Sequence, residues 1–308
     1  MLMESCAQPV AELQLAEPDR ATFVEVNRTR LRLWCWGNVD DPPVLLLHGA
    51  YDHGRMFDDL APRVAALGYH AIAVDFRGHG DSGPLDSGFV WTLLHIDLAL
   101  LVRSLGRGPV GVIAHSFGGG QAIGLAGVFP ELVRWLVNID GLGPPVAAMA
   151  VPEDIPAAVA NNDRRVDRVL FESRRTAESV EELGQRRSAT NLRLSDAWAL
   201  HLARHGTRRV EGGGWVWKAD PMFGIGVPSE FTVELLAEEQ RRVQCPVLVL
   251  TGDQPDTWRD LSDADEAERI GWLRARHVVV PGTGHYVHLE DADATMAAIS
   301  AFISEVAP

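Results

Sequence analysis

A serine lies between a run of apolar residues and three glycines in segment 112–120, VIAHSFGGG. The apolar run predicts a buried strand and the glycines predict a helix start, so Ser116 falls at the turn between them. A strand that becomes a helix within one or two residues strains the residue at the apex. Ala114 and Gly118 are small enough to relieve this crowding. The serine hydroxyl is therefore expected at the carboxyl edge of a sheet, facing a helix N-terminus.

The spacing matches the G-x-S-x-G nucleophile elbow, except that Ala114 replaces the first glycine. The motif alone also fits a glycine-rich helix start in which Ser116 is only the N-cap. A dinucleotide or P-loop site is excluded here, because neither G-x-G-x-x-G nor a Walker lysine is present in the segment. A serine nucleophile needs a base, and the base needs an acid that fixes its tautomer.

The base is predicted to be His285, in the glycine loop that follows the last predicted strand, and His288 is the alternative. The order serine, acid, histidine is typical of elbow-type sites. The acid is predicted to be Asp256, in the loop after the penultimate strand, where it is free to reach the imidazole. The alternatives are Asp140, at the end of LVNID, and Asp253, which lies at a turn where carboxylates usually cap backbone N–H groups.

Two backbone amides are predicted to bind the oxyanion of an acyl-transfer intermediate. They are the N–H of Phe117, directly after the serine, and the N–H of Ala50, after the HG of an earlier strand end. Three aromatic residues are predicted to contact the substrate: Tyr51, Trp217 and Tyr286.

Alternating strand and helix patterns surround these residues and predict a mostly parallel sheet with right-handed crossovers. The regular alternation stops near residue 144 and resumes near residue 241. We therefore expect an α/β core made of residues 1–144 and 241–308, with 1–20 as an N-terminal extension. Residues 145–240 are expected to form a mostly helical cap inserted after the sixth strand.

His201 and His205 lie one helical turn apart and form a candidate metal pair. The sequence shows no third ligand beside them, so an exposed helix face and no metal site are predicted. The three cysteines are far apart and predict neither a disulfide framework nor a zinc site.

The chain has 308 residues, 46% of them hydrophobic, and a formal net charge of -14. Such an acidic surface repels phosphate backbones and anionic lipids, so nucleic acid and membrane partners are not expected. No secretory signal or membrane-spanning apolar run is present, which predicts a cytoplasmic protein. A small-molecule substrate is the expected partner, and the sequence is compatible with a homodimer.

Five segments together resemble the α/β-hydrolase superfamily, in the branch with a helical cap: LLLHGAYDHGRMFDDLAP, VDFRGHGDSG, IAHSFGGG, CPVLVLTGD and VPGTGHYVHLED. The resemblance implies a twisted sheet flanked by helices and a triad of Ser116, Asp256 and His285, without a cofactor. Many relatives place the acid where Pro255 stands here. The resemblance also implies a structural role for segment 77–80, RGHG, and an acidic residue, Glu290, that supports the last helix.

A serine at the elbow, where dehalogenating and epoxide-opening relatives have aspartate, indicates acyl transfer to water. The sequence therefore predicts a serine hydrolase that cleaves an ester, lactone or thioester of a small to medium apolar substrate through an acyl-enzyme. Two alternatives remain on the same fold. One is a cofactor-independent oxygenase or C–C bond hydrolase, and the other is a non-catalytic ligand-binding protein.

Overall fold

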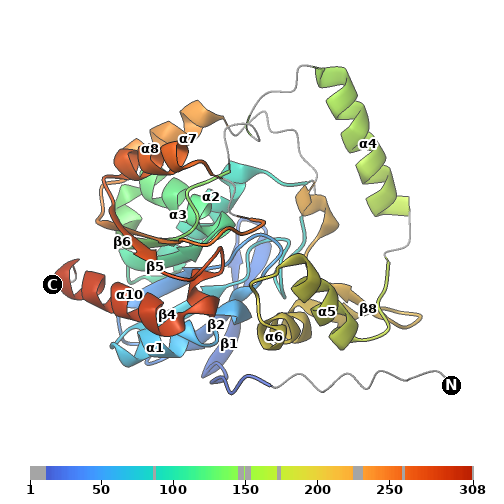
Figure 1. Cartoon of the computed structure of the whole chain (residues 1–308), viewed down its shortest axis with the longest axis horizontal. Coiled ribbons are helices and arrows are strands. Elements are labelled where there is room, and N and C mark those ends of the chain that lie inside the picture. Colours follow the sequence, from blue (N-terminus) through green and yellow to red (C-terminus); the bar gives the residue numbers. More distant parts are fainter. Residues whose placement is uncertain are drawn as a thin grey trace.

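The computed structural model describes residues 12–85, 88–144, 149, 154–171, 175–224, 232–258 and 261–306. Within these ranges the chain forms an eight-stranded sheet in the order β1-β2-β4-β3-β5-β6-β9-β10 (Figure 1). The strands are β1 (Arg20–Val26), β2 (Thr29–Trp36), β3 (Pro43–Leu47), β4 (His70–Val74), β5 (Val110–His115), β6 (Val133–Ile139), β9 (Val247–Gly252) and β10 (Arg276–Val280).

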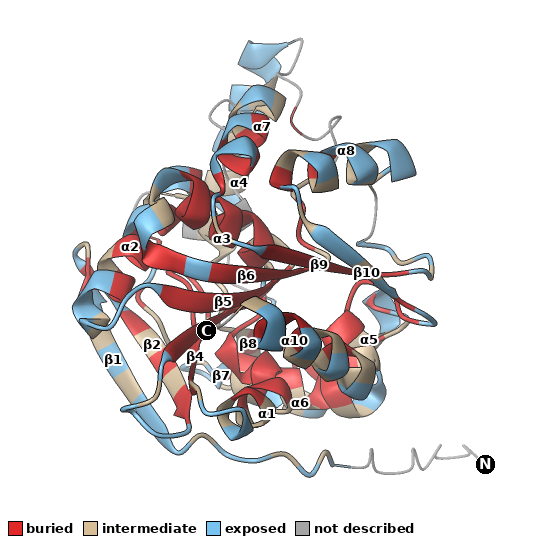
Figure 2. Ribbon diagram, turned by 90° about the vertical axis from the view of Figure 1, so that its left-hand side faces the viewer, coloured by how far each residue is buried: buried red, intermediate tan, exposed pale blue. Residues whose placement is uncertain are grey.

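The strands from β4 to β10 are parallel, and β1 and β2 add an antiparallel edge. All residues of β3, β4, β5 and β9 are buried, which explains their continuous apolar runs (Figure 2). β1, at the edge, alternates between exposed and partly buried side chains. The mostly parallel sheet predicted from the sequence is confirmed.

Helices cover both faces of this sheet. One face packs against η1 (Gly54–Phe57), α1 (Leu60–Ala66), α9 (Val287–Glu290) and α10 (Ala292–Val306). The other face packs against α2 (Trp91–Leu105), α3 (Phe117–Val128) and α8 (Asp263–Leu273), with a short η2 (Pro130–Leu132) before β6. The two hydrophobic cores lie between the sheet and these helices (Figure 2).

The segment between β6 and β9 interrupts the sheet after its sixth strand, as predicted. It contains α4 (Ile155–Phe171), α5 (Val180–Thr190), α6 (Asp196–Gly206), the hairpin β7 (Thr207–Arg209) and β8 (Trp215–Trp217), η4 (Pro221–Gly224) and α7 (Val233–Arg242). In Figure 1, α5, α6 and β8 lie together beside the sheet, and α4 stands apart from them.

The last of these helices, α7, lies on the core although the sequence places it inside the 145–240 cap. Gln240 Nε2 donates a hydrogen bond of 3.1 Å to the carbonyl of Leu142. The backbone of α7 also approaches α3 so closely that a Cβ on Gly127 would lie 2.3 Å from the carbonyl oxygen of Glu239. The sequence pattern of α7 predicts that this segment is helical, but it does not predict which surface the helix packs against.

None of the helices in the described ranges is long and apolar enough to cross a membrane.

Candidate active site

The serine and histidine predicted from the sequence lie within hydrogen-bond distance at the carboxyl edge of the sheet. Ser116 Oγ is 2.9 Å from His285 Nε2. The other ring nitrogen, Nδ1, is 2.7 Å from Oδ2 of Asp140. Because a carboxylate only accepts, Nδ1–H donates to Asp140 and Nε2 is left to accept the serine proton. The side chains of His285 and Asp140 are only 7% and 8% exposed.

The serine lies at a strained strand-to-helix turn, directly after β5 and before α3. Its backbone angles are φ 54° and ψ -121°, and its side chain makes no N-cap hydrogen bond. The alternative interpretation as a plain N-cap is therefore excluded. The turn requires close backbone approaches on both sides: a Cβ on Gly118 would lie 2.4 Å from the Leu47 carbonyl, and one on Gly141 would lie 2.4 Å from the Ser116 carbonyl.

The carboxylate beside the imidazole is Asp140, and the prediction of Asp256 is wrong. Asp140 follows β6, the strand next to β5, and the Ser116 N–H donates to the carbonyl of Ile139 (2.9 Å). The two strand ends therefore place the hydroxyl and the carboxylate side by side. Asp140 has a positive φ of 46°, which turns its side chain out of the strand.

Asp256 instead turns its carboxylate toward backbone amides. Its Oδ1 accepts from Trp258 N (3.1 Å) and its Oδ2 from His285 N (3.3 Å), so it contacts the main chain of the histidine and not the ring. Asp253 caps the histidine loop through Gly282 N (2.7 Å), as expected for a carboxylate at a turn. Hydrogen bonds from Gln254 and from the Gly282 amide lower the pKa of Asp253.

The histidine loop is also held by Glu290. Both carboxylate oxygens of Glu290 lie 3.0 Å from Gly284 N, and Arg193 Nε donates to one of them at 2.7 Å. The loop before the imidazole is thus fixed from α9 and from the cap segment. His288, the alternative base, is buried and stacks on Phe57 with ring centroids 5.4 Å apart.

Two further buried histidines support the same edge of the sheet. His115 lies directly before the serine, and its Nε2–H donates to the carbonyl of His285 (2.9 Å). His48 Nδ1–H donates to Gly49 O (2.7 Å), while its Nε2 accepts from Phe76 N (3.1 Å). Burial lowers the pKa of both imidazoles well below the usual range, so both rings are neutral and act as spacers with fixed tautomers.

The amides predicted to bind an oxyanion lie on either side of the serine. Phe117 begins α3, and Ala50 follows the end of β3, the other neighbour of β5. Neither N–H donates a hydrogen bond to another residue in the described part of the chain. Both donors are thus available to a bound carbonyl oxygen.

A cavity of about 420 Å³ opens onto Ser116 and His285. All three aromatic residues predicted for the pocket, Tyr51, Trp217 and Tyr286, lie in its lining. Tyr51 has a positive φ of 61° and packs edge-on against Phe223 of η4, with ring centroids 5.1 Å apart.

The sequence prediction missed the polar wall of this cavity. Helix α5 contributes Arg186, Arg187 and Thr190 to the lining, and Asn191 follows at its C-cap. Charge-laced helices are usually solvated, so the sequence has no signal that distinguishes these arginines from exposed ones.

Arg187 forms a buried bridge between the cap and the core. Its Nη2 donates to Asp52 Oδ1 and, at 3.0 Å, to the Tyr286 hydroxyl. Burial raises the pKa of Asp52, and the nearby guanidinium offsets only part of that rise. Burial alone would lower the pKa of Arg187, but the Asp52 carboxylate outweighs it, so the pKa of Arg187 is raised. Asp52 lies two residues after Ala50, so this pair connects α5 with the predicted oxyanion loop.

The segment 77–80 has the structural role that the resemblance implies. Arg77 Nε pairs with Asp97 on α2 at 2.8 Å, and Arg77 Nη2 donates to the Asn27 carbonyl at 3.1 Å. Burial lowers the pKa of His79 to about 4. These contacts hold the loop in place and leave no group of it in contact with the serine.

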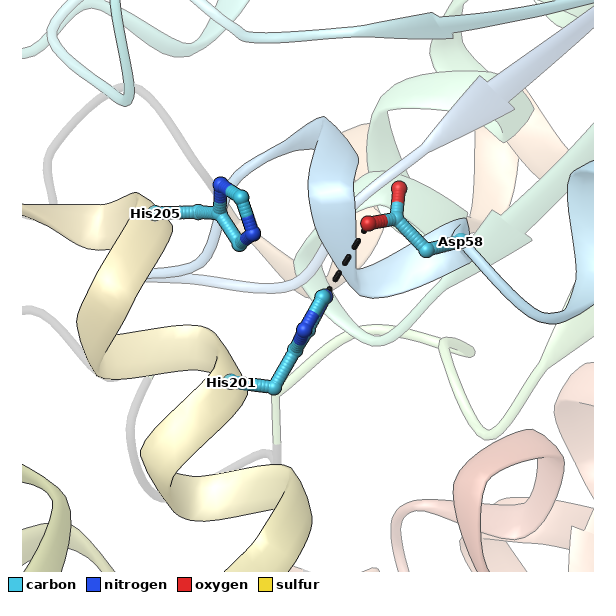
Figure 3. Close-up of side chains that lie close together, drawn as sticks. All are labelled: Asp58, His201 and His205. Carbon is cyan, nitrogen blue, oxygen red and sulfur yellow. Dashed lines mark ion pairs between the residues drawn. The ribbon is translucent and has the colours of Figure 1, made fainter. Parts of the chain in front are cut away.

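The prediction of an exposed face for His201 and His205 is wrong. Both rings project from α6 toward Asp58, at the end of η1, and both residues are partly buried (Figure 3). The third group was not recognisable in the sequence because it lies more than a hundred residues upstream.

Comparisons with known proteins match most of the chain to one family. Residues 44–298 match the alpha/beta hydrolase family. A 2-(acetamidomethylene)succinate hydrolase of Mesorhizobium japonicum is 30% identical over 286 residues, covering 91% of this chain and 94% of that protein. An esterase of Mycobacterium tuberculosis is 28% identical over 296 residues, covering 93% and 89% respectively.

The fold comparison agrees with the sequence comparison. The crystal structure of E-2-(acetamidomethylene)succinate hydrolase superimposes with a TM-score of 0.74 at 26% identity, covering 92% of this chain and 99% of that one. The chain belongs to the alpha/beta hydrolase family.

Proposed function

We propose that this protein is a serine hydrolase that cleaves ester-type bonds, in esters, lactones or thioesters, through an acyl-enzyme. The observation that carries the proposal is the continuous hydrogen-bonded series from Ser116 through His285 to Asp140, at the mouth of a cavity. A hydroxyl, an imidazole and a buried carboxylate in this order can activate a serine for attack on a carbonyl carbon.

In the first half of the reaction, Ser116 Oγ attacks the substrate carbonyl while His285 Nε2 takes the hydroxyl proton. Asp140 accepts from Nδ1–H throughout and stabilises the imidazolium, without taking the proton itself. The amides of Ala50 and Phe117 donate to the developing oxyanion. Loss of one such donor typically lowers kcat by about a hundred- to a thousandfold.

In the second half, the imidazolium returns its proton to the departing alcohol or thiol, and the acyl group stays on the serine. Water then enters and gives a proton to Nε2 as it attacks the acyl carbon. The serine leaves with that proton and the carboxylic acid is released. The residues named here supply every proton transfer of this cycle.

The cavity indicates the size and polarity of the substrate. A volume of about 420 Å³ fits a small to medium molecule. Its aromatic residues suit an apolar group, but the wall from α5 adds charged and amide groups, so the substrate is proposed to carry a polar part as well. An esterase among the relatives agrees with this reaction class. A cytoplasmic location and a homodimer stay predictions of the sequence.

Turnover of a panel of esters, lactones and thioesters of short to long acyl chain tests the proposal. We expect hydrolysis by the native protein and at least a thousandfold loss in Ser116→Ala and His285→Ala. A control variant, Ser304→Ala on the outer face of α10, should keep full activity. Hydrolysis that persists in a folded Ser116→Ala variant, or no hydrolysis of any member of the panel, contradicts the proposal.

A further inference from the structure

A second cluster of ligand-type side chains lies outside the catalytic site, where the cap meets the core. It consists of Asp58, His201 and His205, each of which offers one ligand atom, and these three atoms lie within 4.8 Å of one another (Figure 3). The two imidazoles come from successive turns of α6, and the carboxylate comes from the segment between η1 and α1.

The geometry of the cluster is close to that of a tetrahedral metal centre. His201 Nε2 lies 3.0 Å from Asp58 Oδ2, and the rings of His201 and His205 have centroids 4.7 Å apart. Neighbouring ligand atoms around a tetrahedral zinc ion are about 3.3 Å apart. The three ligand atoms lie within 4.8 Å of one another, so a rotamer adjustment of at most about 1.5 Å in the partly buried His205 would close the site.

The carboxylate is held in place by a second group, as ligands of metal sites usually are. Asp58 is fully buried, and Arg55 Nε donates to both of its carboxylate oxygens, at 2.8 Å to Oδ1 and 2.7 Å to Oδ2. Arg55 also pairs with Glu17 at 2.8 Å, so the charges of Glu17, Arg55 and Asp58 sum to -1 around two imidazoles. A divalent cation would therefore enter surroundings of net negative charge, although the Arg55 guanidinium lies close by.

A metal ion at this place shares its ligand atoms with existing contacts: Arg55 Nε donates to Asp58 Oδ2 at 2.7 Å, and His201 Nε2 lies 3.2 Å from the Arg55 carbonyl oxygen. The guanidinium reaches His205 Nδ1 through a contact of 3.3 Å, the longest that Arg55 makes with these groups. Each carboxylate oxygen has two lone pairs, so Oδ2 of Asp58 can bind the metal through one of them while the carboxylate keeps its contact with Arg55. His201 then carries its proton on Nδ1, because Nε2 becomes the ligand atom.

We propose that Asp58, His201 and His205 form a binding site for a divalent transition-metal ion of the zinc type, with water at the fourth position. Two imidazoles and one carboxylate are the donor set that such ions accept. The ion would fasten α6 of the cap to the start of α1 in the core. His53 Nε2 already bonds the Leu202 carbonyl of α6 at 3.0 Å, so the site would reinforce an existing contact.

The test is titration of tag-free protein with Co²⁺, followed by visible absorption, and with Zn²⁺, followed by calorimetry. We expect one equivalent to bind, with a d–d spectrum of tetrahedral or five-coordinate Co²⁺. Absence of thiolate-to-cobalt charge transfer excludes a cysteine site. His205→Gln should weaken binding by at least about tenfold, and His201→Gln/His205→Gln should abolish the one-equivalent site.

The matched control is His277→Gln, which removes an imidazole of β10 that is not part of this cluster and bonds the Thr251 hydroxyl instead. It should bind Co²⁺ and Zn²⁺ like the native protein, and saturating Zn²⁺ should raise the melting temperature of both but not that of the double variant. Folding of each variant is checked by circular dichroism. Equal affinity in the native protein and the folded double variant, or no binding by the native protein, overturns the proposal.

Discussion

Two residues at neighbouring strand ends adopt the left-handed region of the backbone map: Ser116, with φ 54°, and Asp140, with φ 46°. A non-glycine residue in such a conformation costs on the order of 1–3 kcal/mol. This conformation directs the Ser116 hydroxyl and the Asp140 carboxylate away from their strands, so that they contact the two ring nitrogens of His285 from opposite sides. The local strain thus fixes the direction in which each reactive side chain points.

The assignment of the acid is tested by a pair of conservative variants. Asp140→Asn should lower kcat for ester hydrolysis by about a thousand- to ten-thousandfold, because the amide no longer fixes the tautomer or stabilises the imidazolium. Asp256→Asn changes only a contact to backbone amides and should cost less than about tenfold. Steady-state kinetics of both variants give the answer, and a larger loss in Asp256→Asn would contradict the assignment.

The types of the reactive residues were predictable from the sequence, but the partner of the histidine was not. Ser116 is marked by its small neighbours and His285 by the glycine loop after the last strand. Asp140 and Asp256 both follow a predicted strand, so both reach the same sheet edge. The carboxylate that faces the imidazole is the one that does not accept hydrogen bonds from nearby backbone amides. Which one that is depends on the conformation of the loops.

Because the backbone is closely packed around Gly118, adding one methyl group there is expected to destabilise the protein. Gly118→Ala places a Cβ against the carbonyl oxygens of Leu47 and His48, at 2.4 and 2.6 Å, and these backbone atoms cannot move away separately. We expect a loss of at least about 2 kcal/mol in the free energy of unfolding, together with lower activity.

Gly271→Ala is the matched control for this substitution. Gly271 lies within α8, and nothing is within 4 Å of a Cβ placed there. The change should stabilise the protein by about 0.5–1 kcal/mol. Urea unfolding measures both variants, and equal effects at the two positions would contradict the packing argument.

At the scale of helices and strands, the cap contributes directly to the catalytic site through α5. Arg187 is buried against Asp52 of the predicted oxyanion loop and against the hydroxyl of Tyr286, next to His285. Its ring partner is Trp217 of β8, 5.6 Å from the guanidinium. One side chain therefore joins two cap elements with two loops of the core.

A double-mutant cycle tests this connection. Arg187→Gln leaves the Asp52 carboxylate buried and unpaired, which should cost about 3–5 kcal/mol of stability and reduce kcat/KM. Adding Asp52→Asn should recover part of that stability, since the unpaired charge is removed. Urea unfolding of the two single variants and the double variant measures the interaction; strictly additive losses would show that the pair is not coupled.

The contact between α2 and α7 predicts a pH-dependent stability. Burial raises the pKa of Glu239 to about 7 from an ordinary value of 4.5, and lowers the pKa of the nearby His95 to about 4. Between pH 4.5 and 7 the folded protein keeps the Glu239 proton and the unfolded chain loses it. This contribution therefore favours folding at low pH and is lost as the pH rises to 7.

Glu239→Gln removes this titration and keeps an acceptor for neighbouring donors. We expect the variant to be more stable than the native protein at pH 8 by about 1–3 kcal/mol, with a difference near zero at pH 4.5. The comparison at each pH cancels the contribution of His95, which both proteins share. A stability difference that is the same at both pH values would contradict the raised pKa.

At the scale of the whole molecule, the sheet explains how residues far apart in the chain form one site. β5, β6 and β10 are parallel, so Ser116, Asp140 and the His285 loop all follow strand ends at the same edge. The alternation of strands and helices was sufficient to predict this layout and the insertion after the sixth strand. The packing of α7 on the core and the polar wall from α5 depend on long-range contacts, which periodicity does not encode.

The most direct test of the central claim is the site of covalent labelling by a fluorophosphonate, read by intact mass and peptide mapping. We expect one adduct per chain, on Ser116, with no adduct in Ser116→Ala and slow labelling in His285→Ala and Asp140→Asn. A folded native protein that stays unlabelled, or that carries the adduct on another residue, would contradict this claim.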